Sequence, residues 1–145
     1  MKLLSKYHGE INYEEEDIMK FPFGLPGFEK LRKFIIFSIT ESPEFSILHS
    51  IEDEEVGLVI TNPFIFKPDY EIDLPDYIKV NLKIESPEQV FVYTTVTLNS
   101  CIDNISSNLK APIIINNDFK LGEQYIMEGT KYQIRYPLFK EEKKC

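Results

Sequence analysis

A strict alternation of side chains over residues 89–98 constrains the fold of this chain more than any other feature. One face of that segment carries Val90, Val92, Thr94, Val96 and Leu98, and the other carries Phe91, Tyr93, Thr95 and Thr97. A period of two, filled with β-branched and aromatic residues, predicts a β-strand.

Shorter segments of the same character follow one another along the chain. They are rich in β-branched or aromatic residues and are bounded by Gly, Pro, Asn, Asp or Glu clusters, at 8–13, 33–39, 45–51, 57–62 and 112–116. Two further segments, 70–74 and 132–136, alternate apolar with charged or polar residues and are also expected to be strands. Many short strands at this spacing indicate a small barrel or a sandwich. We predict a mainly β chain, a small antiparallel β-barrel-like single domain with one or two short helices.

Helical signals are confined to two places. Residues 28–32 could form one turn. Residues 76–82 fit either structure, because Ile78, Val80 and Leu82 alternate as in a strand while Ile78 and Leu82 also share a helical face. The pattern alone favours a strand for 76–82.

Length and charge limit the classes of function. The 145 residues fit one domain, here 1–139, followed by a charged tail at 140–145. With 16 basic and 24 acidic residues the formal net charge is −8, which argues against direct binding to nucleic acid or an anionic membrane. The charge favours a basic protein partner, or serves solubility alone.

The location of the protein is inferred from its first residues and its cysteines. The N-terminus has no apolar signal core, and no aliphatic run approaches the roughly 20 residues that span a bilayer. Cys101 and Cys145 form no metal-binding or redox motif and are expected to be free thiols. These features predict a cytoplasmic protein without a metal or other cofactor.

Catalytic signals are weak. His8 and His49 are the only histidines, and no nucleophile, zinc or phosphate-binding motif accompanies them. His49 precedes Ser50, which leaves a hydrolase as a remote alternative, but an ordinary strand histidine is the stronger interpretation. The acidic residues fall in runs such as 14–17 and 52–55, which usually lie on solvated loops. We therefore predict that the chain is not an enzyme.

Two motifs are more informative. The segment 21–29, Phe-Pro-Phe-Gly-Leu-Pro-Gly-Phe-Glu, combines two Pro, two Gly and four large apolar residues, so it predicts a stiff turn with its glycines at positive φ. It is either a structural plug or a preordered contact loop. The segment 108–117, Asn-Leu-Lys-Ala-Pro-Ile-Ile-Ile-Asn-Asn, predicts a short strand edge that is either protected or open to a partner.

Taken together, these elements resemble the FliW family of flagellar assembly factors. The resemblance covers roughly residues 7 to 139 and rests on segments at 9–11, 21–29, 45–50, 108–116, 122–124 and 132–135, with Pro63 and Tyr70. It implies a β-barrel in which residues 76–82 form a short helix, against the periodicity.

The resemblance also implies a function without catalysis. Proteins of this family bind either flagellin or CsrA, a small basic regulator that represses translation of flagellin mRNA. When flagellin is exported, the released protein binds CsrA and relieves the repression. An acidic barrel can approach such a partner quickly and repel RNA. The chain is expected to be a monomer that contacts neither nucleic acid nor membrane.

Candidate partner-binding residues fall into two groups. Glu71, Asp73 and the run 52–55 would supply charge complementarity. Direct contact would come from Phe28, Glu29, Leu48, His49, Ser50, Asn108, Lys110, Pro112 and Asn116, several of which could instead maintain the fold. A β-barrel module that binds a small ligand or carbohydrate is the alternative, supported only by the 8 Tyr and 11 Phe.

Overall fold

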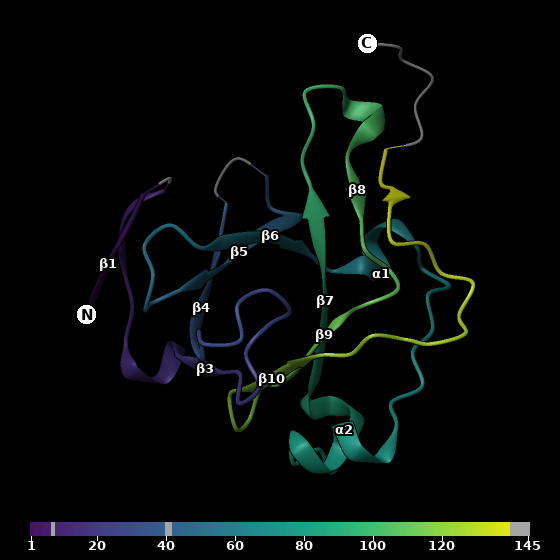
Figure 1. Cartoon of the computed structure of the whole chain (residues 1–145), viewed down its shortest axis with the longest axis horizontal. Coiled ribbons are helices and arrows are strands. Elements are labelled where there is room, and N and C mark those ends of the chain that lie inside the picture. Colours follow the sequence, from purple (N-terminus) through teal and green to yellow (C-terminus); the bar gives the residue numbers. More distant parts are fainter. Residues whose placement is uncertain (7, 40–41, 140–145) are drawn as a thin grey trace.

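The structure is a computed structural model that describes residues 1–6, 8–39 and 42–139, and it is mainly β (Figure 1). The strands are β1 (Lys2–Ser5), β2 (Gly9–Asn12), β3 (Met19–Lys20), β4 (Lys33–Ser38), β5 (Phe45–Ser50), β6 (Gly57–Thr61), β7 (Val90–Thr97), β8 (Ser106–Ser107), β9 (Ile113–Asn116), β10 (Leu121–Gln124) and β11 (Tyr136–Pro137). The helices are α1 (Pro63–Phe66) and α2 (Asp76–Asn81), with single 3-10 turns at Glu15–Asp17, Pro87–Gln89 and Ile102–Asn104. The predicted fold class is confirmed.

The main sheet closes on itself. Its order is β11-β8-β7-β6-β5-β4-β3-β10-β9, and β9 also pairs with β7, which completes a ring. Every neighbouring pair is antiparallel except β3 and β10, whose pairing is parallel at Lys20 and Leu121. The β1–β2 hairpin is a separate two-stranded sheet beside this barrel (Figure 1).

The inside of the barrel is filled by side chains. Phe34, Leu48, Ile60, Ile113 and Ile115 are completely buried there, together with Phe21 from the segment 21–29. The Phe21 ring meets the Phe34 ring edge to face, with centroids 5.2 Å apart. A Cβ added at Gly122 would lie 2.5 Å from the Phe21 ring, so the sheet backbone itself closes over that ring. A filled interior counts against a ligand held inside the barrel.

A second core lies outside the barrel wall, under α2. Ile78 and Leu82 are completely buried against Ile114, while Val80 between them is 74% exposed. This is burial with the period of a helix, so α2 confirms the structure implied by the resemblance, and the strand favoured by the pattern was wrong. Because Ile113 and Ile115 point into the barrel, β9 is buried on both faces.

Two predicted strands, 70–74 and 132–136, are wrong. Residues 70–74 follow a turn at 68–69 and belong to no strand, and within 132–136 only Tyr136 is in a strand, as the first residue of β11. Residues 28–32 form turns rather than helix. The alternation at 70–74 came from packing, because Ile72 and Leu74 lie against the outer core while Glu71 and Asp73 are exposed. Ile134 is 58% exposed, so it does not share an inward face with Tyr132.

Two further expectations concern strand edges and cysteines. β9 pairs with β10 on one side and β7 on the other, so of the two alternatives for the edge at 108–117 the protected one is confirmed and the open one is wrong. Cys101 is disulfide-bonded and buried, so it is not the free thiol we expected. Cys145 and the rest of the tail at 140–145 lie outside the described residues, and the boundary at residue 139 stays a prediction. In the part of the chain that is described, no helix is long and apolar enough to cross a membrane.

Candidate functional site

The segment 21–29 is a structural plug with one exposed acid. Gly24 and Gly27 have φ of +66° and +86°, as the turn chemistry predicts. The half-buried Phe28 packs against the barrel core, and its N–H donates to the Leu25 carbonyl at 2.7 Å. Glu29 is exposed, and Gly27 N–H donates to its Oε2 at 3.0 Å, a bond that lowers the pKa of the Glu29 carboxyl. Of the two residues predicted here, Glu29 is the more accessible.

Leu48, His49 and Ser50 are completely buried. Leu48 is part of the barrel core. His49 Nδ1 lies 2.7 Å from the Ser50 carbonyl oxygen, which can only accept, so Nδ1 carries a proton. His49 Nε2 lies 2.9 Å from Ser5 Oγ and joins the N-terminal hairpin to the barrel. Direct contact of these three side chains with a partner does not fit their positions, so we remove them from the candidate surface.

The same geometry bears on the hydrolase alternative. Ser50 Oγ accepts the N–H groups of Glu52 and Asp53, at 2.9 and 3.0 Å, and His49 contacts the Ser50 carbonyl rather than its hydroxyl. A Cβ at Gly57 would lie 2.7 Å from the His49 ring, so the ring is also enclosed by β6. A nucleophile needs an accessible hydroxyl beside a base, and Ser50 with His49 does not provide one.

The segment 108–116 supports its neighbours. Asn108 Oδ1 accepts the N–H groups of Lys110 and Ala111, each at 3.1 Å. The carbonyls of Lys110 and Pro112 accept N–H groups from Met127 and Tyr125 in the following segment, both at 2.8 Å. Pro112 is buried, and Asn108 and Lys110 are half-buried, so these residues act mainly through the backbone they organise.

Asn116 is completely buried and joins two elements. Its Nδ2 donates to the carbonyls of Leu82 and Lys83, at 2.8 and 3.2 Å, and its Oδ1 accepts the N–H of Asp118 at 2.9 Å. The amide therefore ties the end of α2 to the turn between β9 and β10. Lys83 has a φ of +56°, and its backbone is held there by this contact. Asn116 is a structural residue and not a partner contact.

The exposed candidates Glu71 and Asp73 lie together on residues 67–75, which we call the acidic linker. The linker connects α1 to α2 on the side of the molecule away from the N-terminal hairpin (Figure 1). Tyr70 is buried at its start, and its hydroxyl donates to the Leu109 carbonyl at 2.6 Å. Burial raises the pKa of the Tyr70 phenol, so the hydroxyl stays a donor.

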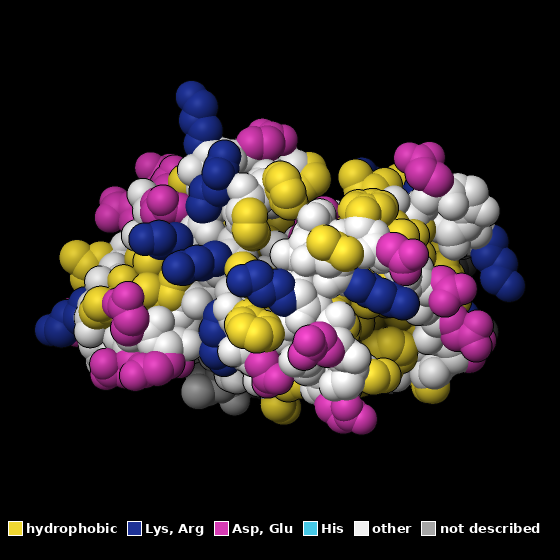
Figure 2. Space-filling model, turned by 90° about the horizontal axis from the view of Figure 1, so that it is seen from below, with side chains coloured by type: hydrophobic (Ala, Val, Ile, Leu, Met, Phe, Trp, Pro, Cys, Tyr) yellow, Lys and Arg dark blue, Asp and Glu magenta, His cyan; other side chains and the backbone are white. Residues whose placement is uncertain are grey.

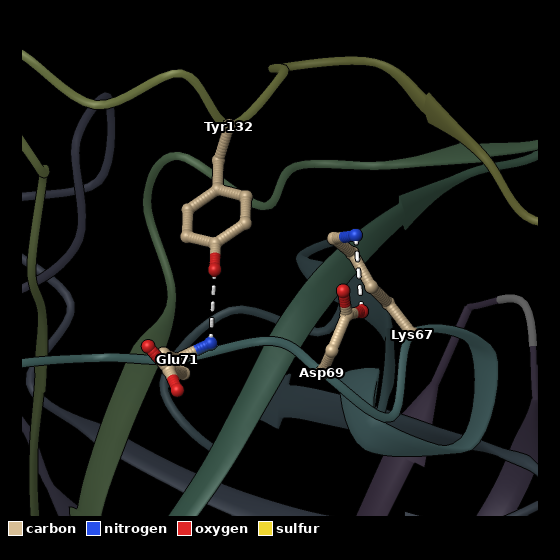
Figure 3. A network of polar contacts seen from close by, with 4 residues as sticks. All are labelled: Lys67, Asp69, Glu71 and Tyr132. Atoms are coloured by element: carbon tan, nitrogen blue, oxygen red, sulfur yellow. Dashed lines mark hydrogen bonds and ion pairs between the residues drawn. The ribbon is translucent and has the colours of Figure 1, made fainter.

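A second tyrosine holds the acidic linker from the other side. Tyr132 OH accepts the N–H of Glu71 at 3.0 Å, and its ring packs edge to face on Tyr70 at 4.8 Å between centroids. Figure 3 shows Tyr132 reaching down to the linker while the Glu71 carboxylate points away from it. Nearby, Lys67 Nζ bonds Asp69 Oδ1 at 3.1 Å and lowers the pKa of the Asp69 carboxyl. The fixed backbone therefore presents Glu71 and Asp73 to solvent.

A groove of about 490 Å³ runs beside the acidic linker. Its wall is made of apolar and charged side chains from α1, the linker, α2, the segment after α2 and β7: Phe64, Ile72, Asp73, Leu74, Lys79, Ile84, Glu85, Ser86, Pro87, Val90 and Val92. Figure 2, seen from the side of α2, shows hydrophobic side chains in a hollow with acidic and basic side chains around it. A second hollow of about 560 Å³ is lined by Glu71, Ile72, Asp73 and Tyr132. This face combines concave apolar surface with exposed acids, as protein-binding sites do.

The structure gathers only part of the predicted site here. Tyr70 ties the linker that carries Glu71 and Asp73 to Leu109 in the segment 108–116. Glu29 belongs to the barrel plug, and the run 52–55 lies in the turn next to the N-terminal hairpin, where Lys6 N–H donates to the Glu54 carbonyl. Glu52 Oε1 there accepts the N–H groups of Arg32 and Lys33. Arg32 bonds both Glu52 and the Glu29 carbonyl, so these two residues lie near each other, while Glu71 and Asp73 lie on the acidic linker.

Sequence reasoning missed Phe64, Lys79, Glu85 and Tyr132. Asn62 followed by Pro63 is a helix start, which could have indicated an exposed Phe64 on a short helix. Nothing local identifies Tyr132, whose partner is 61 residues away. As for metals, no group of three or more His, Cys, Asp or Glu that could hold an ion occurs among the described residues.

Comparison with known proteins gives consistent results. The family model described as "FliW protein" matches residues 2–138. The flagellar assembly factor FliW of Clostridium tetani is 51% identical over 145 residues, covering all of both chains, and that of Clostridium novyi is 52% identical over 97% of this chain and 99% of its own. A crystal structure of the flagellar assembly factor FliW superimposes with a TM-score of 0.91 at 37% identity, over 98% of this chain and 99% of that one.

Proposed function

Since the chain belongs to the FliW family of flagellar assembly factors, we propose that it is a cytoplasmic, non-enzymatic switch between two protein partners. It binds flagellin while flagellin accumulates. Once flagellin is exported, the released protein binds the basic translational repressor CsrA and relieves repression of flagellin mRNA. It acts as a monomer and touches no nucleic acid itself.

The observation that carries this proposal is the exposed pair Glu71 and Asp73 beside an apolar groove. Both carboxylates project from a backbone held by Tyr70 and Tyr132, so little entropy is lost when a partner arrives. Acids fixed at a rim steer a basic partner and raise its association rate. The same charges repel RNA bound near the contact.

The remaining candidate residues contribute to partner binding less directly. Glu29 and the acids of the run 52–55 add to the general negative field from outside the acidic linker. Phe28, Asn108, Lys110 and Pro112 act by shaping the plug and the wall behind the acidic linker. A small-ligand module is less well supported, because the barrel interior is filled by completely buried side chains.

Calorimetric titration tests the proposal directly. The protein is titrated with CsrA and with flagellin from the same organism, and then with CsrA in the presence of saturating flagellin. We expect a one-to-one complex with each partner and weaker CsrA binding when flagellin is present. Binding to neither partner would overturn the proposal even though the family assignment stands.

A further inference from the structure

One edge of β7 is paired along its length and the other is not. On the first edge, Val90–Tyr93 pair with β9, and Val96 and Thr97 pair with β8. On the second edge, the ladder with β6 contains only Ile60 opposite Thr95 and Thr61 opposite Thr94. Within the described residues, positions 90–93 therefore have no strand neighbour on the side of β6.

The ladder stops because of the residue that follows. Continuing its register would set Pro63 opposite Val92, and proline has no N–H to donate. Instead Asn62 Oδ1 accepts the Phe64 N–H at 3.0 Å and starts α1, so the chain leaves the sheet at this point. The break is encoded in the Asn62–Pro63 pair and does not result from a missing strand.

The backbone groups of Val92 point to the open side. In a strand, the N–H and C=O of alternate residues point to the same edge. The carbonyls of Gln89 and Thr95 accept N–H groups from Asn117 and Asn108, so odd-numbered residues point toward β9 and β8. Thr94 and Val92 then point toward β6. Val92 is half-buried, where an unpaired N–H and C=O are costly.

A hollow of about 370 Å³ lies along this edge. It is lined by Asn62, Phe64, Val90, Phe91, Val92 and Tyr93. It shares Phe64, Val90 and Val92 with the groove beside the acidic linker. Phe64 and Phe91 are 40% and 44% exposed, although both are large apolar side chains. An open backbone edge beside apolar hollows is the arrangement in which extended peptides add a strand.

We propose that the open edge of β7 is a docking site for an extended segment of a partner protein. The segment pairs with the N–H and C=O of Val92, and alternate apolar side chains enter the two hollows. Asp73 and Glu85 outnumber Lys79 among the charged residues lining the groove. The segment therefore carries Lys or Arg beside its apolar positions. This inference rests on the proposed function, because the docking segment belongs to the basic partner CsrA.

Amide exchange in the free protein gives the first test. The Thr94 amide lies in the β6 ladder, whereas the Val92 amide is open, so Val92 is expected to exchange at least about tenfold faster in NMR measurements. Equal protection of the two amides would mean that α1 already closes the edge, and the proposal would be wrong.

The complex gives the second test. Saturating CsrA is expected to slow exchange at Val92, and Phe64→Ala to weaken binding about tenfold. Ile65→Ala is the matched control, because Ile65 is the next residue of α1, is 55% exposed and lines neither hollow. Val92→Pro removes an N–H that points away from β9, on the side where β7 has no ladder at this position, and is expected to weaken binding to a similar degree.

The outcomes separate the two proposals. If CsrA binds without protecting Val92, and Phe64→Ala matches Ile65→Ala, this inference is overturned while the proposed function stands. If neither CsrA nor flagellin binds, both are overturned. If the protein alone forms a concentration-dependent dimer with Val92 protected, the edge belongs to a second copy and not to a partner.

Discussion

The hydroxyl of Tyr132 accepts a hydrogen bond from the backbone N–H of Glu71 at 3.0 Å. This single contact joins the C-terminal part of the barrel to the acidic linker and fixes where the linker's two acids point. Together with the bond from Tyr70 OH to the Leu109 carbonyl, it encloses the linker between two tyrosines. The position of the candidate binding surface therefore depends on residues outside it.

Removing the Tyr132 hydroxyl tests this dependence. Tyr132→Phe replaces the acceptor of the exposed Glu71 N–H with water and is expected to lower the free energy of unfolding by about 0.5–1.5 kcal/mol. Hydrogen exchange over residues 69–74 should also accelerate. Tyr125→Phe is the control, since no hydrogen bond joins the Tyr125 hydroxyl to another residue in the described ranges. Equal effects of the two changes in urea unfolding and exchange would contradict the role of Tyr132.

Charge reversal tests the acids themselves. Glu71→Lys with Asp73→Lys is expected to weaken CsrA binding by about tenfold or more, mostly through slower association, and to flatten its salt dependence. Glu15→Lys with Glu16→Lys is the matched double change in a distant run, on the 3-10 turn Glu15–Asp17. Surface plasmon resonance at several salt concentrations measures both effects. An unchanged association rate in the double variant would remove Glu71 and Asp73 from the interface.

Asn116 should be important for stability and not for binding. Asn116→Ala leaves the carbonyls of Leu82 and Lys83 without their donor and is expected to cost about 2–3 kcal/mol. Asn117→Ala, one position along in the same turn, should cost less than about 0.5 kcal/mol. Urea unfolding gives both values. If Asn116→Ala retained full stability but lost CsrA binding, our assignment of a structural role would be wrong.

The N-terminal hairpin should weaken in mild acid. Partial burial, and then the neighbouring His49, lower the pKa of His8 below 6.5. The unfolded chain therefore takes up a proton at higher pH than the folded one. The stability that neutral His8 contributes is present above pH 6.5. It is lost as the pH falls from 6.5 through the lower pKa that His8 has in the folded protein. His8→Gln should flatten this decline in urea unfolding measured between about pH 5 and pH 7.5. An unchanged pH profile would mean that His8 does not contribute.

The barrel strands were predictable because alternating burial accompanies strand pairing there, as in β7, which pairs with β6 and β9. At 70–74 the same alternation reflects packing alone: Ile72 and Leu74 pack inward, but the segment belongs to no strand. Periodicity contains no information on hydrogen-bond partners, so it cannot separate the two cases. At 76–82 it fits both periods and favours the strand, whereas the burial of Ile78 and Leu82 against Ile114 decides for the helix.

The candidate site was predictable where it depended on exposure and charge. Glu71 and Asp73 are on the surface, as acids next to apolar residues usually are. His49 and Ser50 were wrongly predicted to be accessible. A polar side chain is buried only where it finds hydrogen-bond partners, and these can be far away in the sequence: Ser5, which bonds His49, is 44 residues from it. The open edge of β7 exists because the β6 ladder ends at Thr61, opposite Thr94. The register that sets these two residues opposite each other cannot be predicted from either segment alone.

The parallel contact between β3 and β10 is the narrowest seam of the barrel, with one register pair, Lys20 and Leu121, supported by the bond from Lys20 N–H to the Lys120 carbonyl. Its two sides are about a hundred residues apart in the chain, so closing it is costly in loop entropy and is expected late in folding. A chain weakened by mutation should therefore open first at this seam. That opening would expose two strand edges at once, and edge-to-edge aggregation is the hazard that follows.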